Sequence, residues 1–237
     1  MKYARPVVAI DGPASSGKGT VGMLLAERLK CPFVDTGAMY RALAVRAREL
    51  RIDLSDQGCL ERLARECQCR FLEPEIQSKW GYRIFIDDHD VTEKIRTPEI
   101  DMASSRISAY PGVHAAMVEK QRDLARAGGV VMEGRDIGTV VLPDADIKFY
   151  LIASVKERAK RRYLQMKGWG REVDRSQLEN QLCRRDRADS QREVAPLYRA
   201  VDAIVVDTTN LSIEQVLQKI VAELQRTLGP KLFQGGP

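Results

Sequence analysis

The sequence has no apolar run near the ~20 residues that a membrane-spanning helix needs. Its first residues, 1–5, show no signal-peptide pattern and lead straight into an apolar segment. Five cysteines form no even set, and a chain of 237 residues needs no disulfide framework, so reduced thiols are expected. There is no internal repeat and no low-complexity tract. These absences predict a cytoplasmic protein with one main domain.

The cysteines also give little reason to expect a metal site. Cys67 and Cys69, with Cys59 and His89 not far away, match no common zinc-ligand spacing. Small thiols between a helix and a strand explain them equally well, and the acidic residues of 87–90 are those that a tight turn demands. We therefore predict no metal held by protein side chains alone.

The net charge of +5 is concentrated in one segment. Residues 155–192 hold twelve Lys and Arg against six Asp and Glu, whereas the rest of the chain holds 26 against 27. Such a segment can clamp a polyphosphate, although a nucleic-acid patch has the same composition. Its aromatic residues are few, Tyr163 and Trp169, so base stacking is not favoured. An anion clamp is the first interpretation, and a nucleotide-dependent RNA-binding module remains an alternative.

A glycine-rich turn follows the first apolar segment, 6–10, and precedes an amphipathic stretch, 21–29. Its spacing, Gly-x-x-x-x-Gly-Lys, lets backbone amides cradle phosphates while Lys18 neutralises the β/γ region of a nucleotide. Gly19 stands where a Ser or Thr is usual, and the hydroxyl comes one residue later at Thr20. We therefore expect ATP with Mg²⁺, the metal reaching Thr20 through water. The predicted ATP-binding residues of the loop are Gly12, Pro13, Ala14, Ser15, Ser16, Gly17, Lys18, Gly19 and Thr20.

Apolar segments alternate with helical patterns along most of the chain, which is typical of a parallel sheet with crossover helices. The pattern predicts an α/β fold: a P-loop parallel five-stranded sheet flanked by helices. The expected strands are 6–10, 31–35, 130–133, 146–152 and 203–207, and the expected helices of the core are 21–29, 38–50, 98–109, 111–127 and 212–228.

Two segments depart from that alternation. Residues 51–95 read as a β-rich insert with a helix at 58–67, strands at 69–73 and 82–86 and a turn at 87–90. Residues 154–192 read as two helices, starting at Ser154 and Ser176, joined by a glycine-containing tip, and this pair is expected to close as a lid on polyphosphate. The core is then 1–50, 96–153 and 193–237. Arginines that share a face of the first lid helix are predicted to bind ATP: Arg158, Arg161 and Arg162.

Four motifs in order carry a specific resemblance. They are the phosphate loop from Gly12, Asp-Thr-Gly-Ala-Met-Tyr-Arg at 35–41, Gly-Arg-Asp-Ile-Gly-Thr-Val-Val at 134–141 and Arg-Asp-Arg-Ala-Asp-Ser at 185–190. With them the chain resembles the bacterial cytidylate kinase family from about residue 6 to 224. The resemblance implies a nucleoside monophosphate kinase with a P-loop core, a mobile lid and an enlarged monophosphate-binding insert. It implies transfer of the γ-phosphoryl group of ATP to CMP and dCMP.

The resemblance also implies the residue roles. Thr36 and Arg41 would contact the acceptor, Arg41 on its phosphate. Arg135 would bind that phosphate too, and Ser105 and Asp136 would read the cytosine edge. The ribose would be held by Arg185 and Asp189, and Arg192 would reach the phosphates. The expected catalytic cations are Lys18, Arg135, Arg185 and Arg192.

One position departs from the family pattern. An arginine directed at the base is expected where His114 stands. A neutral histidine donates a single hydrogen bond instead of a fork, so we expect weaker base discrimination or a substitute group. A P-loop kinase for another small acceptor remains a second alternative. A monomer without nucleic-acid or membrane partners is the expected state.

Overall fold

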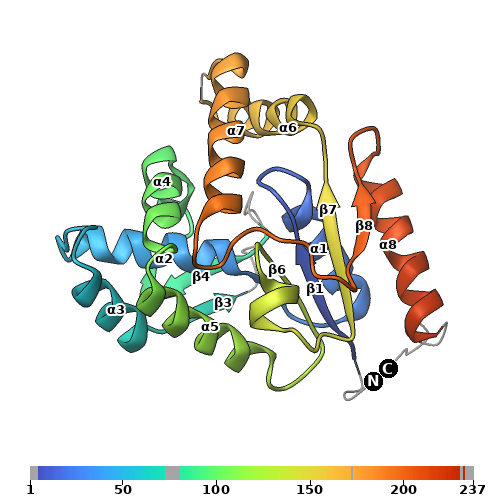
Figure 1. The fold of residues 1–237 in the computed structure, drawn as a ribbon, viewed down its shortest axis with the longest axis horizontal. Helices are drawn as coiled ribbons and strands as arrows, with labels where there is room; N and C mark the ends of the chain where they lie inside the picture. Colours follow the sequence, from blue (N-terminus) through green and yellow to red (C-terminus); the bar gives the residue numbers. More distant parts are fainter. Residues whose placement is uncertain (1–4, 73–80, 172, 230–231, 233–237) are drawn as a thin grey trace. The chain divides into compact units, whose positions relative to one another are not determined.

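The computed structural model describes residues 5–72, 81–171, 173–229 and 232 (Figure 1). The chain forms two compact units. The first contains residues 1–33, 127–192 and 196–237, and the second contains 34–126 and 193–195. The predicted lid, 154–192, lies wholly within the first unit, and the predicted insert, 51–95, lies wholly within the second. As functional segments, both remain predictions.

The central feature of the first unit is a parallel sheet. Its strands are β1 (Val7–Asp11), β6 (Val130–Gly134), β7 (Ile147–Ile152) and β8 (Ile204–Asp207), together with β2 (Phe33–Asp35), which begins in this unit. The order is β2-β6-β1-β7-β8. The registers of β1 with β6 and β7, and of β7 with β8, are all parallel. The predicted α/β fold with a five-stranded parallel sheet is therefore confirmed.

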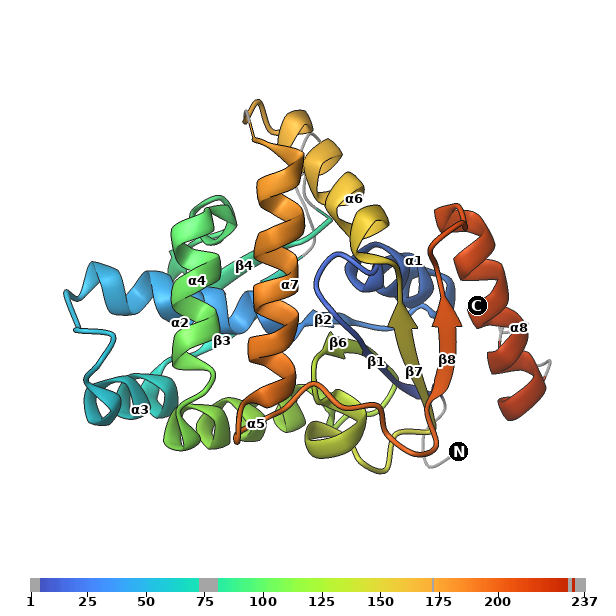
Figure 2. The same ribbon diagram turned by 45° about the horizontal axis from the view of Figure 1, so that its top comes forward.

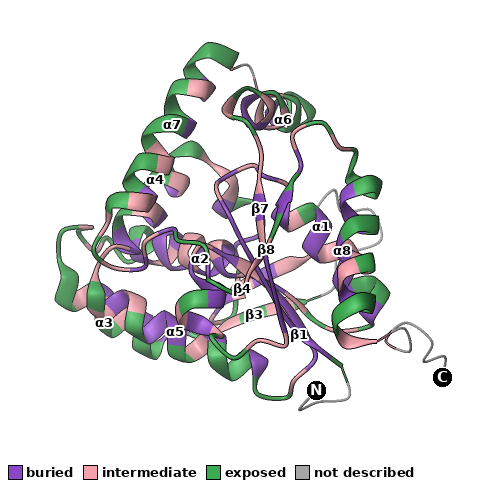
Figure 3. Ribbon diagram, turned by 45° about the vertical axis from the view of Figure 1, so that its right-hand side comes forward, coloured by how far each residue is buried: buried purple, intermediate pink, exposed green. Residues whose placement is uncertain are grey.

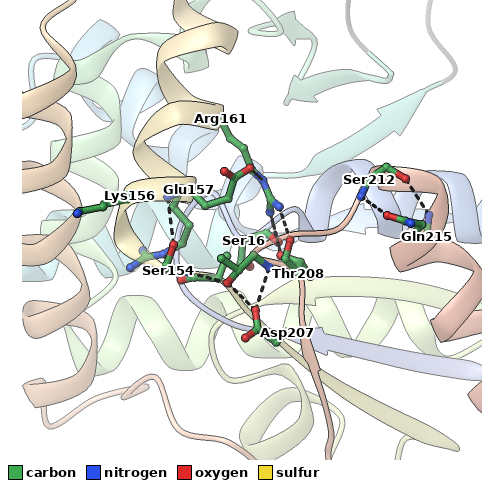
Figure 4. A network of polar contacts seen from close by, with 12 residues as sticks. Ser16, Ser154, Lys156, Glu157, Arg161, Asp207, Thr208, Ser212 and Gln215 are labelled. Carbon is green, nitrogen blue, oxygen red and sulfur yellow. Dashed lines mark hydrogen bonds and ion pairs between the residues drawn. The ribbon is translucent and has the colours of Figure 1, made fainter.

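Helices cover this sheet and extend beyond it. α1 (Lys18–Leu29) and α8 (Ile213–Leu228) contact one another, and α8 lies beside β8 in both ribbon views (Figures 1 and 2). The fully buried strand residues Ile10 and Phe149 belong to the core beneath them, with Leu25 from α1, and the central strands are accordingly drawn as buried (Figure 3). The predicted capping box of α8 is confirmed, because the Ser212 hydroxyl and the Gln215 amide each bind the other residue's backbone nitrogen (Figure 4).

The two helices of the predicted lid are α6 (Val155–Gly168) and α7 (Arg175–Gln191), which pack against each other. The Ser154 hydroxyl accepts the Glu157 amide at 3.3 Å, as expected of its N-cap. An apolar cluster joins the pair to the phosphate loop: Ala14, Ala159, Met166, Leu178 and Leu182. These two helices are thus attached to the loop by buried side chains.

One short element of the first unit was not predicted. Residues Ile137–Val141 form a π-helical turn, η2, directly after β6, where the sequence indicated a glycine-bracketed loop. The Val140 and Leu142 amides donate to the carbonyls of Asp136 and Ile137. A single turn of this kind has too few residues for a periodic signal.

The described residues of the second unit combine four longer helices with a small antiparallel sheet. The helices are α2 (Thr36–Glu49), α3 (Gln57–Glu66), α4 (Pro98–Ile107) and α5 (Pro111–Ala125), and a 3₁₀ turn, η1, covers Lys94–Arg96. The strands β3 (Cys69–Leu72), β4 (Arg83–Ile86) and β5 (His89–Asp90) are ordered β3-β4-β5. The last residue of the predicted strand 69–73 lies outside the described residues.

The turn predicted over 87–90 needs a correction. Asp87 has φ +52° and Asp88 follows it in the turn, but His89 and Asp90 pair with β4 as β5. Their ladder contacts are cross-strand, so the acidic composition alone could not indicate them.

No helix among the described residues is long and apolar enough to cross a membrane.

Candidate active site

The phosphate loop lies between β1 and α1 and has the backbone that its glycines permit. Gly12 has φ +144°, and a Cβ at this position would collide with the carbonyl oxygen of Leu151. Gly17 has φ +98° and immediately precedes α1, which starts at Lys18, three residues earlier than expected. The Lys18 side chain folds back so that Nζ donates to the Pro13 carbonyl at 2.9 Å. A buried ammonium group thus lies against the loop that the sequence predicted.

The backbone at Gly19 lies close to a carboxylate from a neighbouring strand. A Cβ there would lie 3.0 Å from Oε1 of Glu133, the penultimate residue of β6. A side chain at this position would require the carboxylate end of Glu133 to shift by a few tenths of an ångström. Glu133 was missed by the sequence analysis. Its signal was available, since an acid at the carboxyl end of the strand beside β1 lies at the ligand-binding edge of a parallel sheet.

Arg161 reaches the phosphate loop from α6 (Figure 4). Its Nη1 donates to the Ser16 carbonyl at 3.2 Å and to the Thr208 hydroxyl at 2.9 Å, and its Nη2 donates to the Thr208 carbonyl. The Thr208 hydroxyl also lies 3.0 Å from the Ser16 carbonyl, and Glu157 accepts the Arg161 Nε at 3.0 Å. One guanidinium therefore ties together α6, the loop and the residue after β8.

Arg158 is engaged in a similar way. Its side chain is 4% exposed, and Nη2 lies 2.6 Å from Oδ2 of Asp186 on α7. Its Nη1 donates to the Ala14 carbonyl in the loop at 3.2 Å. Arg162 instead donates to Gln165 at 2.9 Å and lies 5.5 Å from the Trp169 ring centre. The three arginines predicted for ATP thus lie on α6, and two of them contact loop carbonyls, while ATP binding by them remains a prediction.

Asp11 fastens the segment after β6 to the end of β1. Its carboxylate accepts the backbone amides of Ile137 at 2.8 Å and Gly138 at 2.7 Å. Burial raises the pKa of Asp11 to about 6, although those two amides work to lower it. This anchor holds the backbone immediately after Asp136, which is itself buried. The sequence analysis did not identify Asp11 as a positioning group.

The structure brings together several predicted acceptor residues of the first unit. Arg135 Nε donates to Oδ2 of Asp189 at 2.9 Å, and Arg192 Nη1 lies 3.8 Å from Oδ1 of the same carboxylate. Burial works to raise the pKa of Asp189, but the charges of Arg135 and Arg185 hold it below its ordinary value. Three cations therefore surround one buried carboxylate, which makes a rigid positive cluster.

The second unit holds the remaining predicted acceptor residues. Thr36 is buried at the first position of α2, and the Arg41 Nη2 donates to Oδ2 of Asp35 at 3.0 Å. Ser105 lies on α4 and His114 on α5, both half-buried. Asp35, the first residue of the motif at 35–41, caps α2, because its Oδ1 accepts the Ala38 amide at 2.8 Å. Tyr82 was missed by the sequence analysis, and its hydroxyl donates to Oδ2 of Asp35 at 2.6 Å.

The cysteines are all described and all carry free thiols. Within the described part of the chain, no group of three or more His, Cys, Asp and Glu side chains could hold a metal ion.

Comparisons with known proteins match the chain almost from end to end. The family model described as "Cytidylate kinase" matches residues 8–226. A protein described as cytidylate kinase from Pseudomonas syringae pv. tomato is 46% identical over 224 residues, 94% of this chain and 97% of that protein. Those from Pelotomaculum thermopropionicum and Pseudomonas aeruginosa are 46% and 44% identical, over 92% and 95% of this chain and 96% and 98% of theirs. A solved gluconokinase from Sinorhizobium meliloti superposes with a TM-score of 0.48 at 18% identity over 99% of each chain.

Proposed function

The chain belongs to the cytidylate kinase family and phosphorylates CMP and dCMP with ATP, and we propose that its glycine loop, 12–20, holds the ATP. The observation that carries this assignment is the buried Lys18 ammonium, held against a loop whose backbone only glycine can follow at Gly12. Amides of the loop and of the first turn of α1 would bind the β- and γ-phosphates. Arg158, Arg161 and Arg162 would add positive charge from α6.

The family generally uses ATP with Mg²⁺, and the residues beside the loop fit this metal. Glu133 offers a carboxylate and Thr20 a hydroxyl, which are the hard oxygen ligands that Mg²⁺ prefers, directly or through its water. We propose these two groups as its protein contacts. When bound, Mg²⁺ neutralises charge on the donor phosphates.

For the acceptor we propose the contacts that the family resemblance implies. In the second unit, Thr36 and Arg41 contact the acceptor, with Arg41 on its phosphate, and Ser105 reads the base. In the first unit, Arg135 binds the phosphate and Asp136 accepts a hydrogen bond from the cytosine amine. Arg185 and Asp189 hold the ribose hydroxyls, and Arg192 reaches the phosphates.

In phosphoryl transfer these groups act mainly by positioning the reactants and by neutralising charge, and they form no covalent bond to the substrate. The transferring group carries negative charge on three equatorial oxygens, and the acceptor oxygen must approach in line with the leaving oxygen. Lys18, Arg135, Arg185 and Arg192 are the proposed cations for that charge. Asp189 keeps Arg135 and Arg192 in fixed positions through the contacts described above, which lowers the reorganisation needed in the transition state.

Asp136→Ala tests the proposed reading of the base. The variant is expected to lower kcat/KM for CMP by about 100-fold, because a buried partner for the cytosine amine is lost. Asp136→Asn is the sharper companion, since its amide can also donate to the carbonyl of uracil, and it should shift the CMP-to-UMP ratio of kcat/KM toward UMP. Steady-state rates with both acceptors and thermal unfolding of each variant measure this. Normal CMP turnover by folded Asp136→Ala would contradict the assignment.

His114 carries a second, smaller proposal about the base. It lies on α5, where the family resemblance leads us to expect an arginine. We propose that its single donor discriminates CMP from UMP less strongly than an arginine would.

A cytoplasmic monomer without nucleic-acid or membrane partners also remains a proposal. The family assignment replaces the two alternatives, a kinase for another small acceptor and an RNA-binding module.

A further inference from the structure

Asp35 is the centre of a half-buried set of contacts in the second unit. Its Oδ1 accepts the Ala38 amide in the first turn of α2 at 2.8 Å. Its Oδ2 accepts both the Tyr82 hydroxyl at 2.6 Å and the Arg41 Nη2 at 3.0 Å. Burial works to raise the pKa of Asp35, but Arg41, Tyr82 and the Ala38 amide together hold it below its ordinary value. The carboxylate is therefore charged at neutral pH, and both of its oxygens are fixed.

Tyr82 is held as firmly as the carboxylate that it contacts. It stands one residue before β4, in the segment that was predicted to be the insert. The Phe71 ring meets its ring edge to face, with centres 5.4 Å apart and planes at 68°. The Arg96 guanidinium lies 5.4 Å from the ring centre, and its Nε donates to the Thr92 carbonyl at 3.2 Å. These two contacts with the ring restrict where its hydroxyl can lie.

The Arg41 guanidinium lies across the start of α2. A Cβ added to Gly37 would be 3.2 Å from Arg41 Nη1 and 3.1 Å from Asp35 Oδ1. The side chain is 17% exposed, so it has little room to adopt another rotamer. Its Nη2 donates to the Asp35 carboxylate, and that carboxylate is in turn held by the Tyr82 hydroxyl and the Ala38 amide at the start of α2.

We propose that Tyr82 is a positioning residue for the acceptor phosphate: through Asp35 it fixes the guanidinium of Arg41. The inference rests on the proposed contact between Arg41 and the phosphate of CMP. In this arrangement the β-rich segment contributes to substrate binding without touching the substrate. Its contribution is specific to the phosphate, because Arg41 is the group that it orients.

Tyr82→Phe removes the hydroxyl and keeps the packed ring. The variant is expected to raise KM for CMP about tenfold, with kcat within threefold and KM for ATP unchanged, since a misdirected Arg41 weakens acceptor binding alone. The inhibition constant of cytidine, which lacks the phosphate, should stay within twofold. A general disturbance of the fold would move all of these values, so they separate positioning from structure.

Two further variants complete the design. Tyr110→Phe is the matched control, because it removes another phenol hydroxyl of the same unit, one that donates to the Leu54 carbonyl at 2.8 Å, and it should leave KM for CMP unchanged. Asp35→Asn is the second variant should Tyr82→Phe unfold. Its neutral amide still caps α2 but loses the charge that holds Arg41, so KM for CMP should rise by a similar factor.

A double-variant cycle distinguishes the two levels of the proposal. Arg41→Met should raise KM for CMP about 100-fold, and Tyr82→Phe should add less than twofold in that background. If Arg41→Met leaves KM for CMP unchanged, the proposed role of Arg41 fails and the inference fails with it. If Arg41→Met raises it but Tyr82→Phe does not, or raises it equally in both backgrounds, the inference alone is overturned.

Discussion

Lys18→Met is expected to lower kcat for CMP phosphorylation by about 1000-fold or more. Methionine keeps the length of the side chain but removes the ammonium group of Lys18, the only lysine of the described phosphate loop. The Nζ of Lys18 lies 2.9 Å from the Pro13 carbonyl oxygen. That charge would stabilise the transferring phosphoryl group in a site where water does not screen it. Initial rates of ADP formation, with saturating ATP and CMP, measure the effect.

The control for Lys18→Met is Lys219→Met on the exposed face of α8. It makes the same chemical change in the same unit and should leave kcat unchanged. Both proteins should show wild-type far-ultraviolet circular dichroism, because neither lysine contributes to the apolar core. A folded Lys18→Met protein with kcat within tenfold of wild type would refute the role given to this residue.

Arg158→Met is expected to lower the free energy of unfolding by about 3 kcal/mol. The loss arises because the substitution leaves Asp186 without the cation that lies 2.6 Å from its Oδ2, in a site where the Arg158 side chain is 4% exposed and that of Asp186 is 22% exposed. The Ala14 carbonyl loses its donor as well. Urea unfolding followed by fluorescence gives the free energy directly.

The double variant Arg158→Met with Asp186→Leu separates a lost attraction from a stranded charge. Removing both partners leaves no unpaired carboxylate, so its loss should be about half that of the single variant or less. A single variant that loses less than about 1 kcal/mol would mean that the cation contributes little to the fold. In that case ATP binding would be the main function of Arg158, and Arg158→Met would instead raise KM for ATP.

Local patterns predicted most of the fold. β1 and β7 follow from mainly apolar runs, and the caps at Ser154 and Ser212 follow from hydroxyls placed just before helical patterns. The phosphate loop was equally visible, because its function depends on residues adjacent in sequence. Gly12, Gly17 and Lys18 each have the conformation or contact that the motif requires.

The supporting contacts could not be read in the same way, because they join residues distant in sequence. Tyr82 and Asp35 are 47 residues apart, as are Arg161 and Thr208, and Asp11 binds the Gly138 amide across 127 residues. No periodicity or spacing encodes such pairs. Gly19 is intermediate: its departure from the usual motif was plain in the sequence, whereas the Glu133 carboxylate beside it required the structure.

The most direct test of the account is the acceptor profile of the full chain. Initial rates of ADP formation from ATP should be compared for CMP, dCMP, UMP, AMP and GMP in wild type and in His114→Arg. CMP and dCMP should be the preferred acceptors, purine nucleotides should be poor acceptors, and His114→Arg should raise the preference for CMP over UMP. A wild-type protein that turns over a purine monophosphate faster than CMP would contradict the account.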